Sequence, residues 1–458
     1  MISGLFCLCD WPKKYFHILL EFLNRQITIV GNYFIMQEYI VVEQSLGLQG
    51  TADLVGAKNA VLVIMTSLLL TAGKSTLTNV PASNDVCMMI LLLEALGAQV
   101  LFNEDEHTLI VDTVSVNKWH VSPDIMKKMR ASVLAMGPLL ARFGHAELAV
   151  PGGCLLGARP IDYHLKNFEK MGVSIAMVGD ELHTSCSQLS ARRIVLEYPS
   201  VGATENIMMA ATLAQGTTTI INAALEPEVF DLIEVLQKMG AHITVNAPAT
   251  IIIEGVQELH PISHAIIPDR LEAGTLLIAT AVTGGKIVLP QARADHLDLV
   301  LYKLDEMGHS IDIGQNNVGI TLRATQAPKA VSFKTTPYPG FPTDLQAPMM
   351  VAQCLAEGTS VIEETVFENR LLHVSELQKM GAIIGVKDNK ATVKGVGQLL
   401  SSAVAATDIR ASCALVLAGM AAHGGTTMMS NTHHFKRGYE ALDIKLNTLG
   451  ARIRFVEE

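Results

Sequence analysis

The chain has 458 residues, of which 49% are hydrophobic and 17% charged, and its formal net charge is -10. This composition is typical of a globular protein with a large core and room for two domains, and it excludes an intrinsically disordered chain. The negative charge disfavours nucleic acid and anionic membranes as partners, and no apolar run reaches the roughly 18 residues that a membrane span requires.

The seven cysteines show no spacing typical of a disulfide framework or of a zinc site. A reducing compartment is the simplest interpretation of this pattern. The sequence therefore predicts a cytoplasmic protein without a metal ion.

The first 35 residues differ from the rest of the chain. They are rich in aromatic side chains, but they lack the basic start, the long apolar block and the cleavage site of a signal peptide. The first expected strand runs from Tyr39 to Val42. We therefore predict that residues 1–35 are an N-terminal extension outside the fold.

A helix tail that ends in Leu-Gly or Met-Gly and leads into a strand recurs six times. Each glycine suits the position just after a helix, where a positive φ is required. The six glycines are Gly97, Gly172, Gly240, Gly308, Gly381 and Gly450. Their spacings lie between 68 and 75 residues. So regular a pattern indicates internal duplication into six units.

A second kind of helix, apolar on nearly every side, precedes a glycine and another strand in each unit. Helices of this kind lie in protein interiors. They are expected at residues 60–71, 132–141, 206–214, 273–282, 347–355 and 411–422. Each unit thus reads helix, strand, helix, strand, with helices in the middle and sheets around them. Three units per globule predict two similar domains of about 200 residues each.

The segment Pro151–Asp162 carries the most distinctive chemistry. Cys154 lies in a glycine-flanked loop, five residues before Arg159. Glycines allow such a loop to fold closely over a ligand, and a nearby guanidinium favours the thiolate and binds phosphate or carboxylate. The alternative is a structural turn with an inert, apolar cysteine. From this segment alone, both interpretations stay open.

Motifs along most of the chain, from Met36 to Glu458, resemble those of the enolpyruvyl transferases. Their number and order make the resemblance specific. The matching stretches are Gly56–Ala60, Met129–Ser132, Leu140–Gly144, Pro151–Cys154, Gly157–Pro160, Ser200–Thr204, Pro268–Arg270, Phe341–Asp344, Phe367–Arg370, Thr407–Ser412 and Lys436–Glu440. The Pro-Gly-Gly-Cys loop resembles the branch whose acceptor is UDP-N-acetylglucosamine. The sister enzyme of aromatic biosynthesis lacks this loop.

The resemblance implies an α/β fold of two inside-out domains. Each domain would consist of three pseudosymmetric repeats, with buried helices surrounded by sheets, in agreement with the six predicted units. Residues 36–58 and 270–458 would form the first lobe, and residues 59–269 the second lobe, which carries the Cys154 loop. The ligands would bind between the lobes, and closure would exclude water.

The implied reaction moves the enolpyruvyl group of phosphoenolpyruvate to the 3-hydroxyl of UDP-N-acetylglucosamine and releases phosphate, as a step of bacterial peptidoglycan synthesis. It requires no cofactor and no metal. The expected partners are these two small substrates, with no nucleic acid and no membrane, and the protein is expected to be a monomer. A non-catalytic ligand-binding paralogue and the shikimate-pathway relative are the alternatives. Cys154 argues against the relative, and no key family residue is lost.

Two residues are predicted to transfer protons, on the basis of the resemblance. Cys154 would protonate the methylene carbon of phosphoenolpyruvate, form a thioether-like adduct with it and be alkylated by fosfomycin. Asp344 would be the general base at the sugar hydroxyl. The same aspartate could instead cap the helix that follows it, and both roles are compatible.

Arginine and lysine side chains are predicted to hold the anionic substrates. Lys58 and Arg437, together with Arg130 and Arg159, would bind phosphoenolpyruvate. Lys58 and Arg437 are also assigned to the catalytic set. The other predicted substrate contacts are Asn59, Pro160, Ile161, Asp162, Ser200, Val201, Gly202, Val366, Arg370, Asp408 and Arg410.

Three positions depart from the family pattern. Tyr198 stands where many relatives have a lysine, Leu134 replaces a tryptophan, and Lys436 replaces an acidic residue before Arg437. One diphosphate contact is therefore expected to be weaker. None of the three touches the predicted proton-transfer groups, so activity is expected.

Overall fold

The computed structural model describes residues 37–124, 130–149 and 161–457. The predicted extension and the Cys154 loop lie outside the described residues, and so does the side chain of Arg130. The secondary-structure elements described below belong almost entirely to the unit from Glu38 to Val456. Within the described residues, no helix is long and apolar enough to cross a membrane.

The six predicted interior helices are confirmed. They are α2 (Lys58–Ser67), η4 with α5 (Arg130–Ala135 and Met136–Phe143), α7 (Val201–Ala211), α9 (Arg270–Thr283), α11 (Gln346–Leu355) and α13 (Ile409–Ala421). Nearly all of their described residues are buried. The second helix differs from the expectation, because its first six residues form a 3-10 turn. The first helix likewise continues as a 3-10 turn, η3 (Leu68–Leu70).

The helices of the Leu-Gly or Met-Gly pattern end as that pattern predicts. These are α3 (Asn84–Leu96), α6 (Asp162–Lys170), α8 (Pro227–Lys238), α10 (Asp298–Glu306), α12 (Val374–Lys379) and α15 (Leu442–Thr448). The glycine that follows each one has a φ between 89° and 108°. The next residue donates its N–H to the carbonyl five positions back at 2.9–3.2 Å, which is the Schellman arrangement. The six units therefore share a backbone signature as well as a sequence signature.

The described residues form six four-stranded sheets, each with one short parallel edge strand. Three sheets use strands between residues 74 and 265. They are β14 (Ser263–Ala265)-β3 (Lys74–Thr78)-β5 (Thr108–Asp112)-β4 (Gln99–Asn103), β6 (His120–Val121)-β7 (His145–Ala149)-β9 (Glu181–Ser185)-β8 (Ser174–Val178) and β10 (Arg193–Val195)-β11 (Thr217–Ile221)-β13 (Thr250–Glu254)-β12 (His242–Asn246).

The other three sheets combine strands from residues 38–51 with strands from residues 285–457. They are β2 (Leu48–Thr51)-β15 (Gly285–Arg293)-β17 (Val318–Arg323)-β16 (Ser310–Ile313), β18 (Phe333–Lys334)-β19 (Thr359–Glu363)-β21 (Lys390–Lys394)-β20 (Ile383–Lys387) and β22 (Ala403–Ala405)-β23 (Thr426–Ser430)-β1 (Glu38–Glu43)-β24 (Arg452–Glu457). This division fits the predicted lobes, whose boundaries at 58/59 and 269/270 stay a prediction.

The first three sheets with their helices form the first set of elements, and the other three form the second set. In each set the short parallel strands link the three sheets into a cycle. β6 follows β5 in the chain but pairs with β7, β10 follows β9 but pairs with β11, and β14 follows β13 but returns to β3. In the second set β18, β22 and β2 do the same. Each sheet therefore depends on its neighbour for an edge, and each cycle of three closes on itself. The expectation of two strands per unit was too low, since the return strand and the parallel edge strand were missed.

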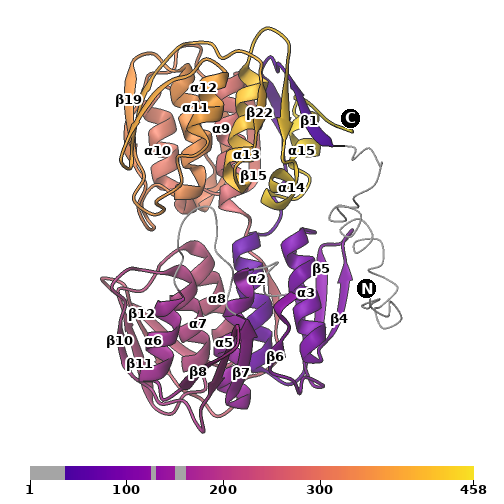
Figure 1. The fold of residues 1–458 in the computed structure, drawn as a ribbon, viewed down its shortest axis with the longest axis vertical. Coiled ribbons are helices and arrows are strands. Elements are labelled where there is room, and N and C mark those ends of the chain that lie inside the picture. The colour runs from indigo at the N-terminus through magenta and orange to yellow at the C-terminus, as the bar shows by residue number, and fades with distance from the viewer. Residues whose placement is uncertain (1–36, 125–129, 150–160, 458) are drawn as a thin grey trace, which may run out of the picture. The chain divides into compact units, whose positions relative to one another are not determined.

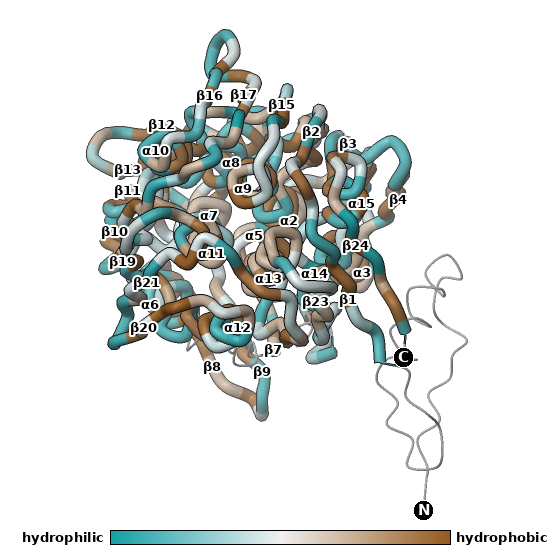
Figure 2. Tube along the Cα trace, turned by 90° about the horizontal axis from the view of Figure 1, so that it is seen from above, coloured by the Kyte–Doolittle hydropathy of each residue, from teal (hydrophilic) through white to brown (hydrophobic). Residues whose placement is uncertain are grey.

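The interior of each set consists of its apolar helices. In the second set, α9, α11 and α13 pack against one another (Figure 1). In the first set, α5 packs against α7, and α2 contacts η4. Figure 2 shows strands at the periphery and the interior helices further in. Burial of each large aliphatic side chain stabilises this arrangement by about 2 kcal/mol. The inside-out α/β fold of two threefold-repeated domains is thus confirmed.

Candidate active site

Asp344 lies between two arginines that come from different units of the second set. Its Oδ1 accepts a hydrogen bond from Arg370 Nη2 at 2.6 Å, and its Oδ2 accepts one from Arg410 Nη2 at 2.7 Å. These two cations hold the pKa of Asp344 far below its usual range, even though burial opposes them. The carboxylate is therefore ionised at neutral pH.

The helix-cap alternative for Asp344 is wrong. Asp344 belongs to the 3-10 turn η7 (Thr343–Leu345), and α11 begins after Leu345 without a side-chain cap. Both carboxylate oxygens are used by the arginines, so none remains for the N–H groups of the helix.

Arg370 and Arg410 are buried, with side chains only 3% and 8% exposed. Among the described residues, Arg370 Nε and Arg410 Nη1 have no hydrogen-bond partner. An unpaired buried donor costs about 1–3 kcal/mol, and more when it is charged. Neither arginine is a surface ion pair, and both have donors free for an anion.

Arg410 is fixed by the start of its own helix and by an aromatic ring. Asp408 caps α13, where its Oδ1 accepts the N–H groups of Arg410 and Ala411 at 2.8 and 3.1 Å. The Arg410 guanidinium lies 5.0 Å from the centre of the Tyr439 ring. Tyr439 is held in turn by a 2.9 Å hydrogen bond between its hydroxyl and Thr275 Oγ1. The guanidinium is thereby oriented before any ligand binds.

Lys58 and Arg437 meet at a second carboxylate, Asp85. Lys58 Nζ lies 3.3 Å from Asp85 Oδ2 and donates to the Arg437 carbonyl at 3.1 Å. Arg437 Nη2, at the end of α14 (His433–Gly438), donates to Asp85 Oδ1 at 3.2 Å. Asp85 lies in the first turn of α3 and was not among the predicted site residues. These contacts join α3, which belongs to the first set, to Arg437 of α14 in the second set and to Lys58 at the start of α2.

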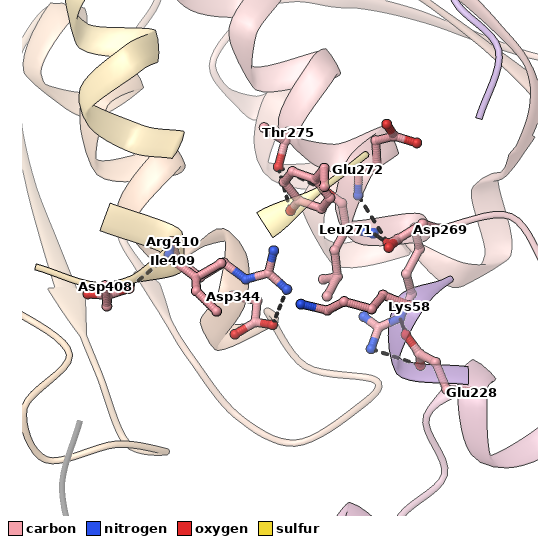
Figure 3. Close-up of polar contacts among 12 residues, drawn as sticks. Lys58, Glu228, Asp269, Leu271, Glu272, Thr275, Asp344, Asp408, Ile409 and Arg410 are labelled. Carbon is pink, nitrogen blue, oxygen red and sulfur yellow. Dashed lines mark hydrogen bonds and ion pairs between the residues drawn. The ribbon is translucent and has the colours of Figure 1, made fainter. Parts of the chain in front are cut away.

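Lys58 also faces Arg410. Figure 3 shows the Lys58 amine directed toward the Arg410 guanidinium, with Asp344 beside that arginine. Burial, followed by the positive charge of Arg410, lowers the pKa of Lys58, while Asp85 and Asp269 raise it. Two cations that face each other in a buried place favour an anion between them. The geometry thus brings Lys58, Asp344, Arg370 and Arg410 into one site.

Glu364 connects Val366 to the segment that carries Asp344. Its Oε1 accepts the N–H groups of Val366 and Phe367 at 2.8 and 3.1 Å, and its Oε2 accepts the hydroxyl of Thr343 at 2.9 Å. Val366 is half-buried, next to this buried carboxylate. Glu364, like Asp85, was not predicted as a site residue, because a buried glutamate outside any motif cannot be recognised from the sequence.

The residues predicted for the uridine diphosphate side lie at two helix N-termini. Ile161 precedes α6, and Ser200 caps α7 by accepting the N–H of Ala203 at 3.4 Å. A Cβ at Gly202 would lie 3.5 Å from His164 Cε1 in α6, so the two helix starts are adjacent. Helix N-termini favour anions through their free N–H groups. Val201 begins α7, and Asp162 begins α6 and is exposed.

Several predicted site residues have a limited or no description. Cys154, Arg159 and Pro160 lie outside the described residues, and only the backbone of Arg130 is described, at the start of η4. That turn is anchored by Asn206, whose Nδ2 donates to Val133 O at 3.0 Å. Asn59 is exposed at the beginning of α2.

The structure shows the surroundings of the three residues that depart from the family pattern. Lys436 Nζ lies 2.6 Å from Glu38 Oε1, so its charge is neutralised beside Arg437. Leu134 is buried near Gly202. Burial, with Glu226 and Glu364 nearby, raises the pKa of the Tyr198 phenol, so this residue adds no charge for a diphosphate.

Among the described residues, no group of three or more histidine, cysteine, aspartate or glutamate side chains is arranged to hold a metal ion. The charged groups of the site are instead paired cations and carboxylates. Such a site suits phosphate and carboxylate ligands.

Comparison with known proteins gives a consistent picture. The family model of EPSP synthase (3-phosphoshikimate 1-carboxyvinyltransferase) matches residues 42–446. UDP-N-acetylglucosamine 1-carboxyvinyltransferase 1 of Caldanaerobacter subterraneus subsp. tengcongensis is 46% identical over 418 residues, which are 91% of this chain and 99% of the relative. The enzyme of the same name from Staphylococcus aureus is 46% identical over 421 residues, with 92% and 99% covered.

Solved structures with lower identity share the fold. The enolpyruvyl transferase NikO from Streptomyces tendae has a TM-score of 0.84 and 24% identity, and covers 92% of this chain and all of its own. EPSP synthase from Acinetobacter baumannii has a TM-score of 0.74 and 16% identity, with the same shares covered.

Proposed function

The chain belongs to the EPSP synthase family of enolpyruvyl transferases, and from this premise we propose that it transfers the enolpyruvyl group of phosphoenolpyruvate to the 3-hydroxyl of UDP-N-acetylglucosamine. The transfer releases phosphate and serves peptidoglycan synthesis. Relatives with 46% identity over nine tenths of the chain carry the name of this activity. We further expect a monomer that acts in the cytoplasm.

The observation that best supports this function is the pair of buried arginines around Asp344. Each arginine gives one donor to the carboxylate and keeps another buried donor unpaired. Lys58 adds a third cation that faces Arg410. A phosphate or carboxylate would satisfy these donors and relieve the repulsion between the cations.

Asp344 is the general base of the proposed reaction. In the absence of ligands its two arginines make it a very weak base. A substrate anion bound to the unpaired donors of the same arginines would offset part of their positive charge and so raise the proton affinity of Asp344 when the sugar hydroxyl must lose a proton. Binding and base strength are thereby coupled.

The cationic residues and Cys154 are assigned to phosphoenolpyruvate. Lys58 and Arg437, with Arg130 and Arg159, hold phosphoenolpyruvate and stabilise the charge that develops during addition. Cys154 protonates the methylene carbon, and the proton returns in the elimination step.

The remaining contacts serve UDP-N-acetylglucosamine. Asn59 contacts the sugar, and the helix starts at residues 161–162 and 200–202 receive the diphosphate. Val366 and Asp408 contribute to the same ligand from the second set of elements.

Phosphate release on mixing the protein with both substrates tests the function directly. We expect release that requires both phosphoenolpyruvate and UDP-N-acetylglucosamine, and none when shikimate 3-phosphate replaces the sugar nucleotide. Tight binding of both ligands without release would instead indicate a binding protein.

The role of Cys154 is tested by two substitutions. Cys154→Ser should fold, lose turnover and escape fosfomycin labelling. Cys154→Asp should keep turnover and escape the drug, because aspartate also carries a proton. Full turnover in Cys154→Ser would exclude the thiol as the proton donor.

A further inference from the structure

We propose that Asp85 is a positioning residue that holds Lys58 and Arg437 until the anionic group of phosphoenolpyruvate takes its place. This inference rests on the proposed function for the identity of the anion. The contacts that carry it are those of the protein alone, and they can be tested without turnover.

The geometry of the contact resembles that of a bound substrate anion. Asp85 gives one carboxylate oxygen to each cation: Oδ2 to Lys58 and Oδ1 to Arg437. A carboxylate or a phosphate of the substrate presents oxygens in the same way. Asp85 is 8% exposed and is placed by α3, whose start is capped by Ser83. It is therefore a nearly buried counter-ion whose backbone position is set by the helix.

The contacts of Asp85 with Lys58 and Arg437 are weak enough to be replaced by a ligand. Its two distances, 3.3 and 3.2 Å, exceed the 2.7–2.9 Å typical of strong charge-assisted hydrogen bonds. The side chain of Arg437 is 38% exposed, so solvent screens its half of the contact. A substrate anion that also reaches Arg410 would compete favourably for the same cations.

There is little room beside Lys58. A hollow of about 10 Å³ borders Lys58, and its other walls include Asp269, Tyr439 and Glu440. Such a volume holds about one water molecule. A phosphate does not fit in this hollow, so an anion that approached Lys58 from this side would have to displace the Asp85 carboxylate or move the elements around it.

The charge state of Lys58 depends on the carboxylate of Asp85. Burial and Arg410 favour the neutral amine, whereas Asp85 and Asp269 favour the ammonium form. Cys413, Glu272, Tyr439, Glu440 and Arg437 are further titratable or charged residues near it among the described residues. Of the two carboxylates that support the charge, only Asp85 forms an ion pair with Lys58. Its loss should make Lys58 lose its proton at a lower pH.

Asp85→Asn tests this role, and Glu104→Gln is the matched control, because it removes an exposed carboxylate from the turn after β4. Acetylation of Lys58 by acetic anhydride, followed by peptide mass spectrometry across pH 7–10, reports the neutral amine without any need for turnover. We expect Lys58 in Asp85→Asn to react at least three times faster than in the wild type at the same pH. Glu104→Gln should behave like the wild type.

Kinetics provide the second measurement. In Asp85→Asn the alkaline limb of kcat/KM for phosphoenolpyruvate should move to lower pH by about one unit, which corresponds to 1.36 kcal/mol. The KM for UDP-N-acetylglucosamine should change less than twofold. Asp85→Glu keeps the negative charge, so the alkaline limb of kcat/KM should stay at the wild-type pH. The KM for phosphoenolpyruvate should rise. This variant also provides the test if the asparagine variant does not fold.

Equal Lys58 reactivity in Asp85→Asn and wild type, with an unmoved alkaline limb, would overturn the proposal. A parallel loss of kcat/KM for both substrates would do so as well, because it indicates a structural role only. A wild type that releases no phosphate but still shows the reactivity difference would refute the proposed function and leave the Asp85 contact supported.

Discussion

Asp344 and Asp85 are two carboxylates that each bind two cationic side chains, yet their surroundings differ. Asp344 is held at 2.6 and 2.7 Å by arginines that are less than a tenth exposed, and all three residues belong to the second set of elements. Asp85 is held at 3.3 and 3.2 Å, and it belongs to the first set, unlike Arg437.

The difference separates a fixed part of the site from a replaceable one. Short, buried contacts within one set resist displacement, because breaking them leaves buried charges unpaired. Longer contacts between elements of both sets, with one partner partly in solvent, are more easily exchanged for a ligand.

The largest effect is expected for Asp344→Asn. Loss of the proposed general base should lower kcat about 10²–10⁴-fold. Two buried arginines lose their counter-ion, so the free energy of unfolding should fall by roughly 3 kcal/mol. Asp85→Asn should lose only about 1 kcal/mol, because Arg437 is partly exposed. Phosphate release and urea unfolding measure both quantities.

Asp53→Asn is the control for this comparison, since Asp53 is exposed and its carboxylate accepts a hydrogen bond from the neutral amide of Gln291. It should change neither quantity appreciably. An Asp344→Asn protein with near-normal kcat would remove Asp344 from the catalytic set.

The arginines should respond in the same order. Arg410→Lys loses the planar fork and the stacking on Tyr439, so kcat/KM for phosphoenolpyruvate should fall by roughly 100-fold. Arg437→Lys should cost about tenfold, because its contact with Asp85 is longer and more exposed. Steady-state kinetics of both variants test this order.

Arg293→Lys, which alters an exposed pair with Asp295, is the matched control and should be near wild type. A larger loss in Arg437→Lys than in Arg410→Lys would reverse the assignment of the fixed and replaceable contacts.

A buried histidine behind the Asp344 cluster gives the cluster a pH dependence in stability. His373 donates from Nδ1 to the Arg370 carbonyl at 3.1 Å, and burial lowers its pKa to about 4. An unfolded histidine has a pKa near 6.5, so between pH 6.5 and 4 the unfolded chain binds the extra proton. The stability contribution is therefore complete above pH 6.5 and is lost as the pH falls.

For His373 alone this loss should be about 2 kcal/mol between pH 7 and pH 5. In His373→Asn, urea unfolding should show a correspondingly smaller difference between the two pH values. His242→Asn, at an exposed position, should retain the wild-type difference. Identical pH dependence in His373→Asn and wild type would contradict this interpretation.

The smallest effect concerns the thiols next to the two carboxylate clusters. Cys413 lies three residues after Arg410, and Cys87 lies two residues after Asp85. Burial raises the pKa of each thiol to about 11. At pH 7.5 roughly one molecule in several thousand carries the thiolate, which is the reactive form.

Iodoacetamide at pH 7.5 should therefore leave Cys87 and Cys413 unmodified, and fosfomycin should modify the peptide that contains Cys154. Peptide mass spectrometry after a short incubation checks both outcomes. Rapid labelling of Cys413 would show that its environment is more open than its burial indicates.

Much of the fold follows from local patterns. The helix-ending glycines are all at positive φ, and the all-round apolar helices are all interior. The strands were predicted less well, because parallel edge strands such as β6 and β18, with two residues each, carry no periodic signal. Their pairing partners come from the next unit, which a local pattern does not encode.

The site was predictable only where a motif carried it. Lys58, Asp344, Arg370 and Arg410 were identified from matching stretches, and the structure brings them together. Asp85 was missed, since its contact with Arg437 spans 352 positions of the chain.

The sequence by itself determined the six-unit repeat, the interior helices and the positions of the charged motifs. These depend on helical periodicity and on the φ that glycine permits, which are properties of neighbouring residues. Only the tertiary structure decided that Asp344 binds two arginines instead of capping a helix, and that Asp85 bridges Lys58 and Arg437. Ion pairs depend on distance and burial in space, and packing of remote segments sets both.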